Sequence, residues 1–258
     1  MCYNHRIHAG NAGDVWKHFI LAEIAEYLLA KEKKLVYFES HVGYPEYPLA
    51  MPGEWQDGIG RCWTRLNALK EFSYFQILDQ MNPAGLRNYP GSATVTLKVA
   101  TKAGIALEAD IWDINPEVSF SWHDIALPGS DKLRFHLGDG FLGMGSLVDR
   151  YKPALLLIDP PYLEREDLGR SADLFEKAAS SGWTVLLWQM IDVDDSRDEF
   201  RNNSTEKYSV NFSDVGLSCG KWFGAVMTLA GSGDLQDYVN QRVRDFLRIM
   251  QHQNLFKI

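Results

Sequence analysis

The apolar run at residues 154–158 ends abruptly in a carboxylate, two prolines and a tyrosine, and it constrains the fold more than any other stretch. The run has no alternating polar positions, so it predicts a strand buried on both faces, as in a parallel sheet. Proline cannot continue a central strand, which places Asp159 at or just past the strand's carboxyl end. Because ligands of open α/β sheets bind beyond that end, Asp159-Pro160-Pro161-Tyr162 is predicted to lie in a functional site.

Other apolar runs of strand length alternate with helical patterns along the chain. This alternation predicts an α/β fold with a mostly parallel sheet, an antiparallel partner at its end, and a single domain over residues 1–258. The expected strands are 35–38, 105–113, 133–137, 154–158, 183–188, 208–212 and 222–230, and the expected helices are 94–101, 141–151, 167–180 and 235–251.

Residues 46–88 interrupt the alternation of strands and helices, and their pattern predicts a small helical subdomain inserted after the first strand. A second helical piece should follow the first and end at Pro83. Residues 89–92 are expected to form a tight turn into the next helix. The first piece is predicted to be one amphipathic helix whose apolar face, interpreted as core, holds Trp55, Ile59, Cys62, Trp63, Leu66 and Leu69.

Basic and titratable side chains crowd the amino terminus before and within an expected helix. Asp14 is the predicted N-cap, and the apolar residues that follow predict one buried helix side. Two interpretations remain open: a functional segment, or a solvated arm with one histidine packed against the helix. The crowded side chains are His5, Arg6, His8, Lys17 and His18.

Composition narrows the class of protein. The 258 residues are 46% hydrophobic and 23% charged, which is ordinary for a globular protein. No apolar run approaches the roughly 20 residues of a membrane helix, and the first residues lack a signal peptide's apolar core, so we expect a cytoplasmic protein. Three widely spaced cysteines indicate neither a disulfide framework nor a metal cluster. A net charge of −8 disfavours broad coating of nucleic acid but allows a local basic patch.

The tetrapeptide resembles the motif of methyltransferases that modify exocyclic amino groups of nucleobases. An adenine N6 lone pair is delocalised into the ring and is a poor nucleophile. The Asp159 carboxylate and the Pro160 carbonyl can both accept hydrogen bonds from that amino group and stabilise the charge that grows during attack. Tyr162 offers a stacking face for an extruded base. The alternative interpretation is a strand end capped by Asp159 with a Pro-Pro turn.

Across its whole length the chain resembles the 23S ribosomal RNA adenine-N6 methyltransferase J family, called in older descriptions a family of extracellular-DNA utilisation proteins. The resemblance implies a Rossmann-like class I S-adenosylmethionine-dependent methyltransferase fold with a helical subdomain inserted after the first strand. It is carried by Tyr3, His5, His8-Ala9-Gly10-Asn11, Asp14-Val15, Lys17-His18, Gly53-Glu54-Trp55, Gly58-Ile59, Tyr89-Pro90-Gly91-Ser92, Gly138-Asp139-Gly140 and Ile158-Asp159-Pro160-Pro161-Tyr162.

The resemblance also implies roles for individual residues. It implies S-adenosylmethionine as cofactor and 23S ribosomal RNA as partner. The cysteine spacing and the lack of a long apolar run separately predict no metal and no membrane, and no obligate protein partner is inferred. The resemblance implies Asp159 as the catalytic acceptor and Tyr3 as a substrate contact. With the residues argued from their chemistry, the expected catalytic residues are Asp159, Pro160 and Tyr162, and the expected substrate contacts are Tyr3, His5, His8 and Lys17. The expected cofactor contacts are His18, His41, Ser92, Asp113, Asp139, Gly140 and Asp159.

Two of the cofactor contacts are also indicated by their positions in the fold. Asp113 ends an expected strand, where an acidic residue commonly binds ribose hydroxyls, although residues 113–117 also look like a helix start. Asp139 follows an expected strand, where an aspartate in such folds often contacts the adenine amino group of S-adenosylmethionine, but its Gly-Asp-Gly segment is equally well a simple turn.

The loop after the first strand departs from the family pattern. Glu39 and Pro45 stand where the family has Asp and a second Gly, and Asp113 stands where it usually has Glu. Val42, Tyr44 and Pro45 leave less room beside a methionine moiety than glycines would. This loop leaves open a nucleic-acid-binding relative with weak or lost methyltransferase activity. Because the tetrapeptide occurs in enzymes that act on either polymer, a DNA adenine-N6 methyltransferase is a second alternative.

Overall fold

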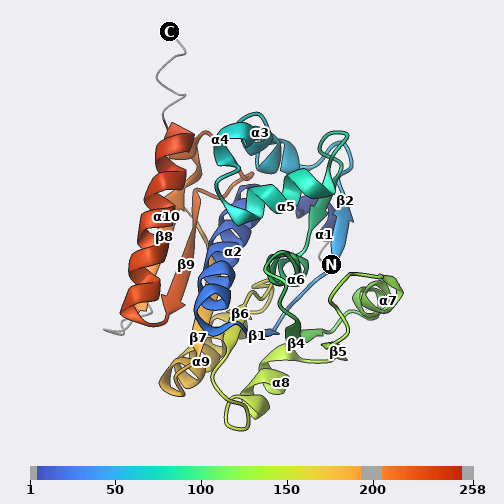
Figure 1. Cartoon of the computed structure of the whole chain (residues 1–258), viewed down its shortest axis with the longest axis vertical. Coiled ribbons are helices and arrows are strands. Elements are labelled where there is room, and N and C mark those ends of the chain that lie inside the picture. The colour runs from blue at the N-terminus through green and yellow to red at the C-terminus, as the bar shows by residue number, and fades with distance from the viewer. Residues whose placement is uncertain (1–4, 193–204, 252–258) are drawn as a thin grey trace.

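The computed structural model describes residues 5–192 and 205–251 (Figure 1). Its centre is a seven-stranded sheet in the order β5-β4-β1-β6-β7-β9-β8. The first five strands in this order are parallel, and β9 runs antiparallel to both β7 and β8. The predicted α/β fold, with an antiparallel pair at the end of a mostly parallel sheet, is confirmed. The strands are β1 (Leu35–Glu39), β4 (Leu107–Asp113), β5 (Leu133–Leu137), β6 (Leu155–Ile158), β7 (Thr184–Ile191), β8 (Thr205–Asn211) and β9 (Gly224–Ala230).

Strand β6 lies in the middle of the sheet, between β1 and β7. All of its residues are buried, as the uninterrupted apolar run predicts. Leu155 and Leu157 belong to the core on one side of the sheet, while Leu156 and Ile158 belong to the core on the other. Asp159 therefore leaves the sheet at the end of its most enclosed strand.

Helices cover both faces of the sheet. The larger core lies under α2 (Ala12–Glu32), α6 (Ser92–Lys102) and α10 (Gly233–Gln251), which lie side by side in Figure 1. The smaller core lies under α8 (Gly140–Leu147) and α9 (Glu166–Ser180). At the edge of the sheet, α7 (Pro116–Asp124) packs beside β4 and β5.

Helix α2 is buried far more completely than its sequence suggested. The predicted apolar side is buried, and between residues 12 and 25 the rest of the helix except Asp14 is buried as well. The predicted N-cap is wrong: Asn11 caps the helix by accepting the Asp14 backbone N–H at 2.9 Å, and Asp14 lies inside the first turn. Because residues 9–18 are buried apart from Asn11 and Asp14, they do not form a solvated arm.

The segment between β1 and α6 is helical, but its elements are shorter than expected. The predicted amphipathic helix is broken into η1 (Glu54–Gln56), α3 (Ile59–Trp63) and α4 (Leu66–Leu69), followed by α5 (Ser73–Met81). The tight turn expected at residues 89–92 is also wrong, because β3 (Asn88–Pro90) pairs antiparallel with β2 (Glu46–Pro48) and leads directly into α6. Residues such as Cys62 and Phe75 join the core under α2, and the division of 46–88 as an inserted subdomain stays a prediction.

Candidate active site

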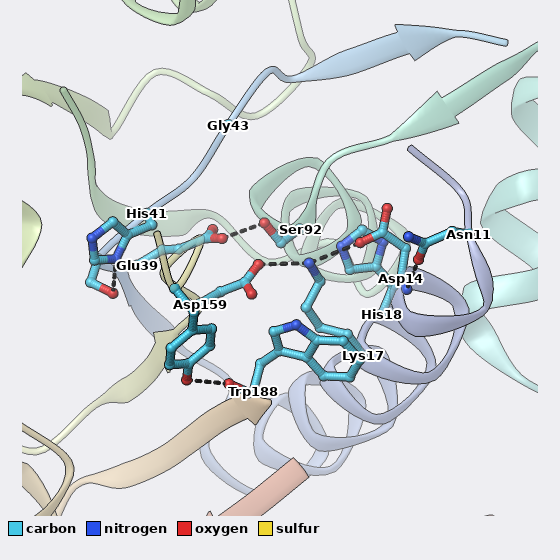
Figure 2. A network of polar contacts seen from close by, with 12 residues as sticks. Asn11, Asp14, Lys17, His18, Glu39, His41, Gly43, Ser92, Asp159 and Trp188 are labelled. Carbon is cyan, nitrogen blue, oxygen red and sulfur yellow. Dashed lines mark hydrogen bonds and ion pairs between the residues drawn. The ribbon is translucent and has the colours of Figure 1, made fainter. Parts of the chain in front are cut away.

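A cleft of about 950 Å³ opens at the carboxyl ends of β1, β6 and β7. The amino-terminal part of α2 forms one wall, and the chain that follows β6 forms another. Figure 2 shows Asp159 between His41, Gly43 and Ser92 on one side and Trp188 on the other, and all five residues line the cleft. The predicted position of the tetrapeptide, beyond the carboxyl end of a central strand, matches its place in this cleft.

Asp159 forms a cluster with two residues of α2. Lys17 Nζ lies 2.6 Å from Asp159 Oδ2 and 2.9 Å from Asp14 Oδ1. Figure 2 shows the lysine between the two carboxylates. The Lys17 side chain is only 9% exposed and that of Asp159 15%, so the ions are largely shielded from water. No described residue forms a hydrogen bond to the other oxygen, Asp159 Oδ1, which leaves it available as an acceptor.

Burial and charge act in opposite directions on this cluster. Burial raises the pKa of Asp159 to about 6, although the Lys17 ammonium pulls it down. Burial also works against ionisation of Asp14 and Lys17, yet their mutual attraction holds the Asp14 pKa below its ordinary value and the Lys17 pKa well above its own. At neutral pH all three groups are charged, and Asp159 is close enough to its titration range to exchange a proton.

The backbone after Asp159 holds Tyr162 in an uncommon conformation. Its φ is 51°, in the left-handed region, which costs a non-glycine residue roughly 1–2 kcal/mol. Its hydroxyl donates a hydrogen bond of 2.5 Å to the Trp188 carbonyl, which ties the chain after β6 to the end of β7. Both Pro160 and Tyr162 line the cleft, so the fold brings the three predicted catalytic residues together.

Three of the predicted cofactor contacts, His18, His41 and Ser92, line the cleft beside Asp159. Burial lowers the pKa of His18 to about 3 and that of His41 to about 4. Ser92 donates a hydrogen bond to Glu39, whose pKa burial raises to about 8. Both histidines and Glu39 are therefore neutral at pH 7.

The other predicted cofactor contacts are not among the described residues that line the cleft. Asp113 accepts the backbone N–H of Gly43 at 3.1 Å and that of Asn115 at 2.8 Å. Asp139 is the N-cap of α8 and is ion-paired with Arg170 at 2.5 Å. The Asp113 side chain thus holds the loop after β1, while Asp139 fixes the start of a helix.

Gly140 is required by a close approach of two backbone segments. A Cβ at this position would lie 1.7 Å from the Ser40 carbonyl oxygen, so no side chain fits there. The start of α8 can therefore pack directly against the loop that follows β1. This packing gives Gly140 a role in shaping the site, whether or not it contacts a cofactor.

The loop after β1 adopts its positive φ and forms its backbone hydrogen bonds without a second glycine. Gly43 takes the left-handed conformation with a φ of 65°. The Pro45 carbonyl accepts hydrogen bonds from Gly91 N at 2.9 Å and Thr94 Oγ1 at 2.7 Å. Val42 and Gly43 line the cleft, but Tyr44 and Pro45 are not among its described lining residues.

The predicted substrate contacts are only partly within the described structure. Lys17 and His8 line the cleft, and His8 Nδ1 lies 2.9 Å from Glu54 Oε1. His5 begins the short helix α1 (His5–His8). Tyr3 lies outside the described residues.

Sequence reasoning missed Asp14 and Trp188 as parts of the site. The spacing of Asp14 and Lys17, three residues apart in a helix, was the available signal for their ion pair. Trp188 lines the cleft from within β7, with its ring centroid 5.6 Å from Lys17 Nζ. A tryptophan at the end of an apolar strand gives no separate sign of such a role.

In the part of the chain that the structure describes, no group of three or more histidine, cysteine, aspartate or glutamate side chains is arranged to hold a metal ion. Among the same residues, no helix is long and apolar enough to cross a membrane.

Comparison with known proteins gives consistent matches. Residues 32–201 match the family model described as "Ribosomal RNA large subunit methyltransferase D, RlmJ". Two proteins named "Ribosomal RNA large subunit methyltransferase J" are similar in sequence. The one from Haemophilus influenzae is 30% identical over 204 residues, covering 73% of this chain and 69% of the relative. The one from Escherichia coli is 29% identical over 175 residues, covering 65% of this chain and 61% of the relative.

A solved structure shares the fold over nearly the whole chain. Protein LPL1258 from Legionella pneumophila superposes with a TM-score of 0.76, at 20% identity, over 95% of this chain and 94% of that one. At this identity the likeness concerns the fold alone.

Proposed function

Because the chain belongs to the ribosomal RNA large subunit methyltransferase J family, we propose that it methylates N6 of an adenine in 23S ribosomal RNA with S-adenosylmethionine. The observation that carries the proposal is the position of Asp159 in the cleft, with Oδ2 bonded to Lys17 and no described partner on Oδ1. The free oxygen is a preformed acceptor at the place where a base amino group would enter.

The residues beside Asp159 fit the proposed cofactor. His18 is almost fully buried and lines the cleft, and no described residue bonds its Nε2, so this nitrogen is available to a ligand. Gly43 and Gly91, which have no side chains, also line the cleft. When bound, S-adenosylmethionine supplies a methyl group on a sulfonium centre, which an amine can displace. In this proposal His18, His41 and Ser92 hold the cofactor in the cleft, and Asp113, Asp139 and Gly140 contribute at its margin.

Asp159 and Pro160 would activate the adenine. Oδ1 of Asp159 and the Pro160 carbonyl accept hydrogen bonds from the amino group, which localises its lone pair for attack on the methyl carbon. The cofactor held by His18, His41 and Ser92 would supply the methyl group, and the methylated nitrogen would then have one proton to lose. Asp159 can accept that proton, since burial holds its pKa near 6. Tyr162, fixed by its bond to Trp188, gives the extruded base a stacking face.

Lys17 and Asp14 would keep Asp159 ionised and oriented. A buried carboxylate without a counter-ion tends to take up a proton, and Lys17 opposes this. In turn, Asp14 holds the lysine from the first turn of α2. We therefore assign Lys17 to the orientation of Asp159 in addition to the substrate contact expected from the sequence.

The amino-terminal residues Tyr3, His5 and His8 are proposed as substrate contacts near the target base. Positive or protonatable groups there would attract RNA phosphates locally, despite a net charge of −8. Action on ribosomal RNA implies a cytoplasmic protein. No metal and no obligate protein partner enter the proposed reaction.

One experiment separates this function from the alternatives. The full chain is titrated calorimetrically with S-adenosylmethionine and then incubated with matched RNA and DNA strands that contain adenine. We expect cofactor binding and methylation of the RNA strand. Absence of cofactor binding would indicate a relative that has lost activity, and preferential methylation of the DNA strand would indicate a DNA adenine-N6 methyltransferase.

A further inference from the structure

A buried row of three side chains connects the helical segment after β2 with the wall of the cleft. His18 Nδ1 lies 2.9 Å from the Tyr89 hydroxyl, which lies 2.8 Å from the Tyr74 hydroxyl. The His18 ring stacks on Tyr89 with centroids 5.5 Å apart, and the Tyr74 ring meets the His18 ring nearly at right angles at 6.2 Å. All three side chains are buried, and His18 is the member of the row that lines the cleft.

The number of hydrogens in this row decides its direction. Each tyrosine has one hydroxyl hydrogen, and no described residue other than these three bonds either hydroxyl. If Tyr74 donates to Tyr89 and Tyr89 donates to His18 Nδ1, both hydrogens are used. If His18 Nδ1 carried a hydrogen and donated to Tyr89, one hydroxyl hydrogen would be left unpaired in a buried place. Such an unpaired donor costs free energy, so the first arrangement is favoured.

The direction of the row determines what His18 offers to the cleft. With Nδ1 as an acceptor, the neutral ring carries its hydrogen on Nε2. Burial lowers the His18 pKa to about 3, and the neighbouring Lys17 ammonium lowers it too, so the ring stays neutral. The side chain therefore presents one N–H donor where no described residue accepts it.

We propose that Tyr74 and Tyr89 are positioning residues that fix His18 as the Nε2–H tautomer, so that it would donate to an acceptor group of the bound cofactor. The ligand in this statement rests on the proposed function, since S-adenosylmethionine carries several hydrogen-bond acceptors. Tyr74 belongs to α5, so in this proposal the segment that interrupts the α/β pattern influences the cleft through Tyr89 and His18.

The tautomer is measured directly in the free protein by nuclear magnetic resonance of ¹⁵N-labelled histidine. The comparison includes the full chain, Tyr89→Phe and Tyr74→Phe, with Tyr208→Phe as a matched control. Tyr208 is also a buried tyrosine, and its hydroxyl donates to the Gln236 carbonyl at 3.2 Å, away from His18. The dissociation constant of S-adenosylmethionine is measured for the same four proteins by calorimetry.

We expect an unprotonated Nδ1 at His18 in the full chain and a mixture of tautomers in Tyr89→Phe. Cofactor affinity should fall by about two- to tenfold in Tyr89→Phe, which corresponds to one neutral hydrogen bond. Tyr74→Phe should change both readouts less but in the same direction, and it keeps the test available if Tyr89→Phe fails to fold. The Tyr208 variant should change neither.

A hydrogen on His18 Nδ1 in the full chain would overturn the proposal. So would an unchanged His18 spectrum and an unchanged affinity in both variants of the row. Failure of the full chain to bind S-adenosylmethionine is a different result, because it overturns the proposed function while the spectrum still tests the tautomer.

Discussion

Two groups of side chains in and around the cleft differ in charge. In the neutral group, burial holds His18, His41 and Glu39 in their uncharged forms, with pKa values of about 3, 4 and 8. In the charged group, Lys17 Nζ lies 2.6 Å from Asp159 Oδ2 and 2.9 Å from Asp14 Oδ1. Under the proposed function, the neutral group would bind the cofactor through neutral hydrogen bonds, while the charged group would act on the reacting amino group.

The largest effect is expected from removing the Asp159 carboxylate. Asp159→Ala should lower the turnover of RNA methylation by on the order of 10²-fold or more, because it removes a preorganised acceptor. S-adenosylmethionine affinity should change little, since His18, His41 and Ser92 remain. Turnover and calorimetric affinity are measured on the same preparation. Near-normal turnover would refute the assignment of Asp159.

Deletion of residues 1–8 tests the substrate contacts proposed at the amino terminus. We expect a strong loss of RNA methylation and a much smaller loss of cofactor affinity, because His18 and His41 remain. Methylation of a naked RNA fragment by the full chain should also fall with added salt, as phosphate contacts release counterions. A truncated protein that methylates RNA as fast as the full chain would make this segment dispensable.

The pH dependence of the reaction tests the link between Lys17 and Asp159. Burial raises the pKa of Asp159 to about 6, and the acceptor must be ionised, so kcat/KM should rise with pH through about 6. In Lys17→Met the lowering effect of the ammonium is lost while burial remains. The midpoint should therefore move upward by about one pH unit or more.

The same raised pKa has an opposite consequence for stability. A carboxyl group that binds its proton more tightly in the folded state contributes stability that is greatest below its ordinary pKa and is lost as pH rises through about 6. The free energy of unfolding of Lys17→Met should thus fall relative to that of the full chain between pH 5 and pH 8, as measured by urea unfolding at both pH values.

The preceding prediction on the rate has its own contrary result. If the pH profile of kcat/KM does not shift in Lys17→Met, the ion pair does not control Asp159.

The smallest effect is expected on cofactor affinity, from Pro45→Gly in the loop after β1. The family pattern predicts that a glycine here tightens S-adenosylmethionine binding. The structure limits the expected gain, because the positive φ in this loop belongs to Gly43 and the Pro45 carbonyl is already bonded to Gly91 and Thr94. Calorimetry on the variant checks the direction, and unchanged or weaker binding would show that the present loop already has a compatible geometry.

Much of the fold could be predicted from the sequence because its strands are uninterrupted apolar runs. Residues 154–158 predicted a central buried strand, and β6 has that position. The family match confirms the resemblance and the Rossmann-like methyltransferase fold inferred from sequence motifs. The ends of helices were predicted less reliably, since Asp14 was the predicted N-cap of α2 but Asn11 is the observed one.

The candidate site was harder to predict where its geometry depends on distant parts of the chain. Lys17 and Asp159 are 142 positions apart, and nothing in either local sequence specifies their ion pair. The row from Tyr74 through Tyr89 to His18 joins α5, β3 and α2, which only the folded chain brings together. Sequence motifs identified Lys17, Asp159 and His18 as site residues, but the charge state of each depends on its burial and partners in the folded chain.

The most direct test of the central claim is the identity of the methylated nucleoside. A 23S ribosomal RNA preparation is incubated with methyl-labelled S-adenosylmethionine and either the full chain or Asp159→Asn, which preserves shape but removes the charge. The RNA is then digested and its nucleosides are separated. We predict label in N6-methyladenosine with the full chain and its loss with Asp159→Asn. Label in any other nucleoside, or equal N6-methyladenosine from both proteins, would contradict a mechanism in which Asp159 activates the adenine amino group.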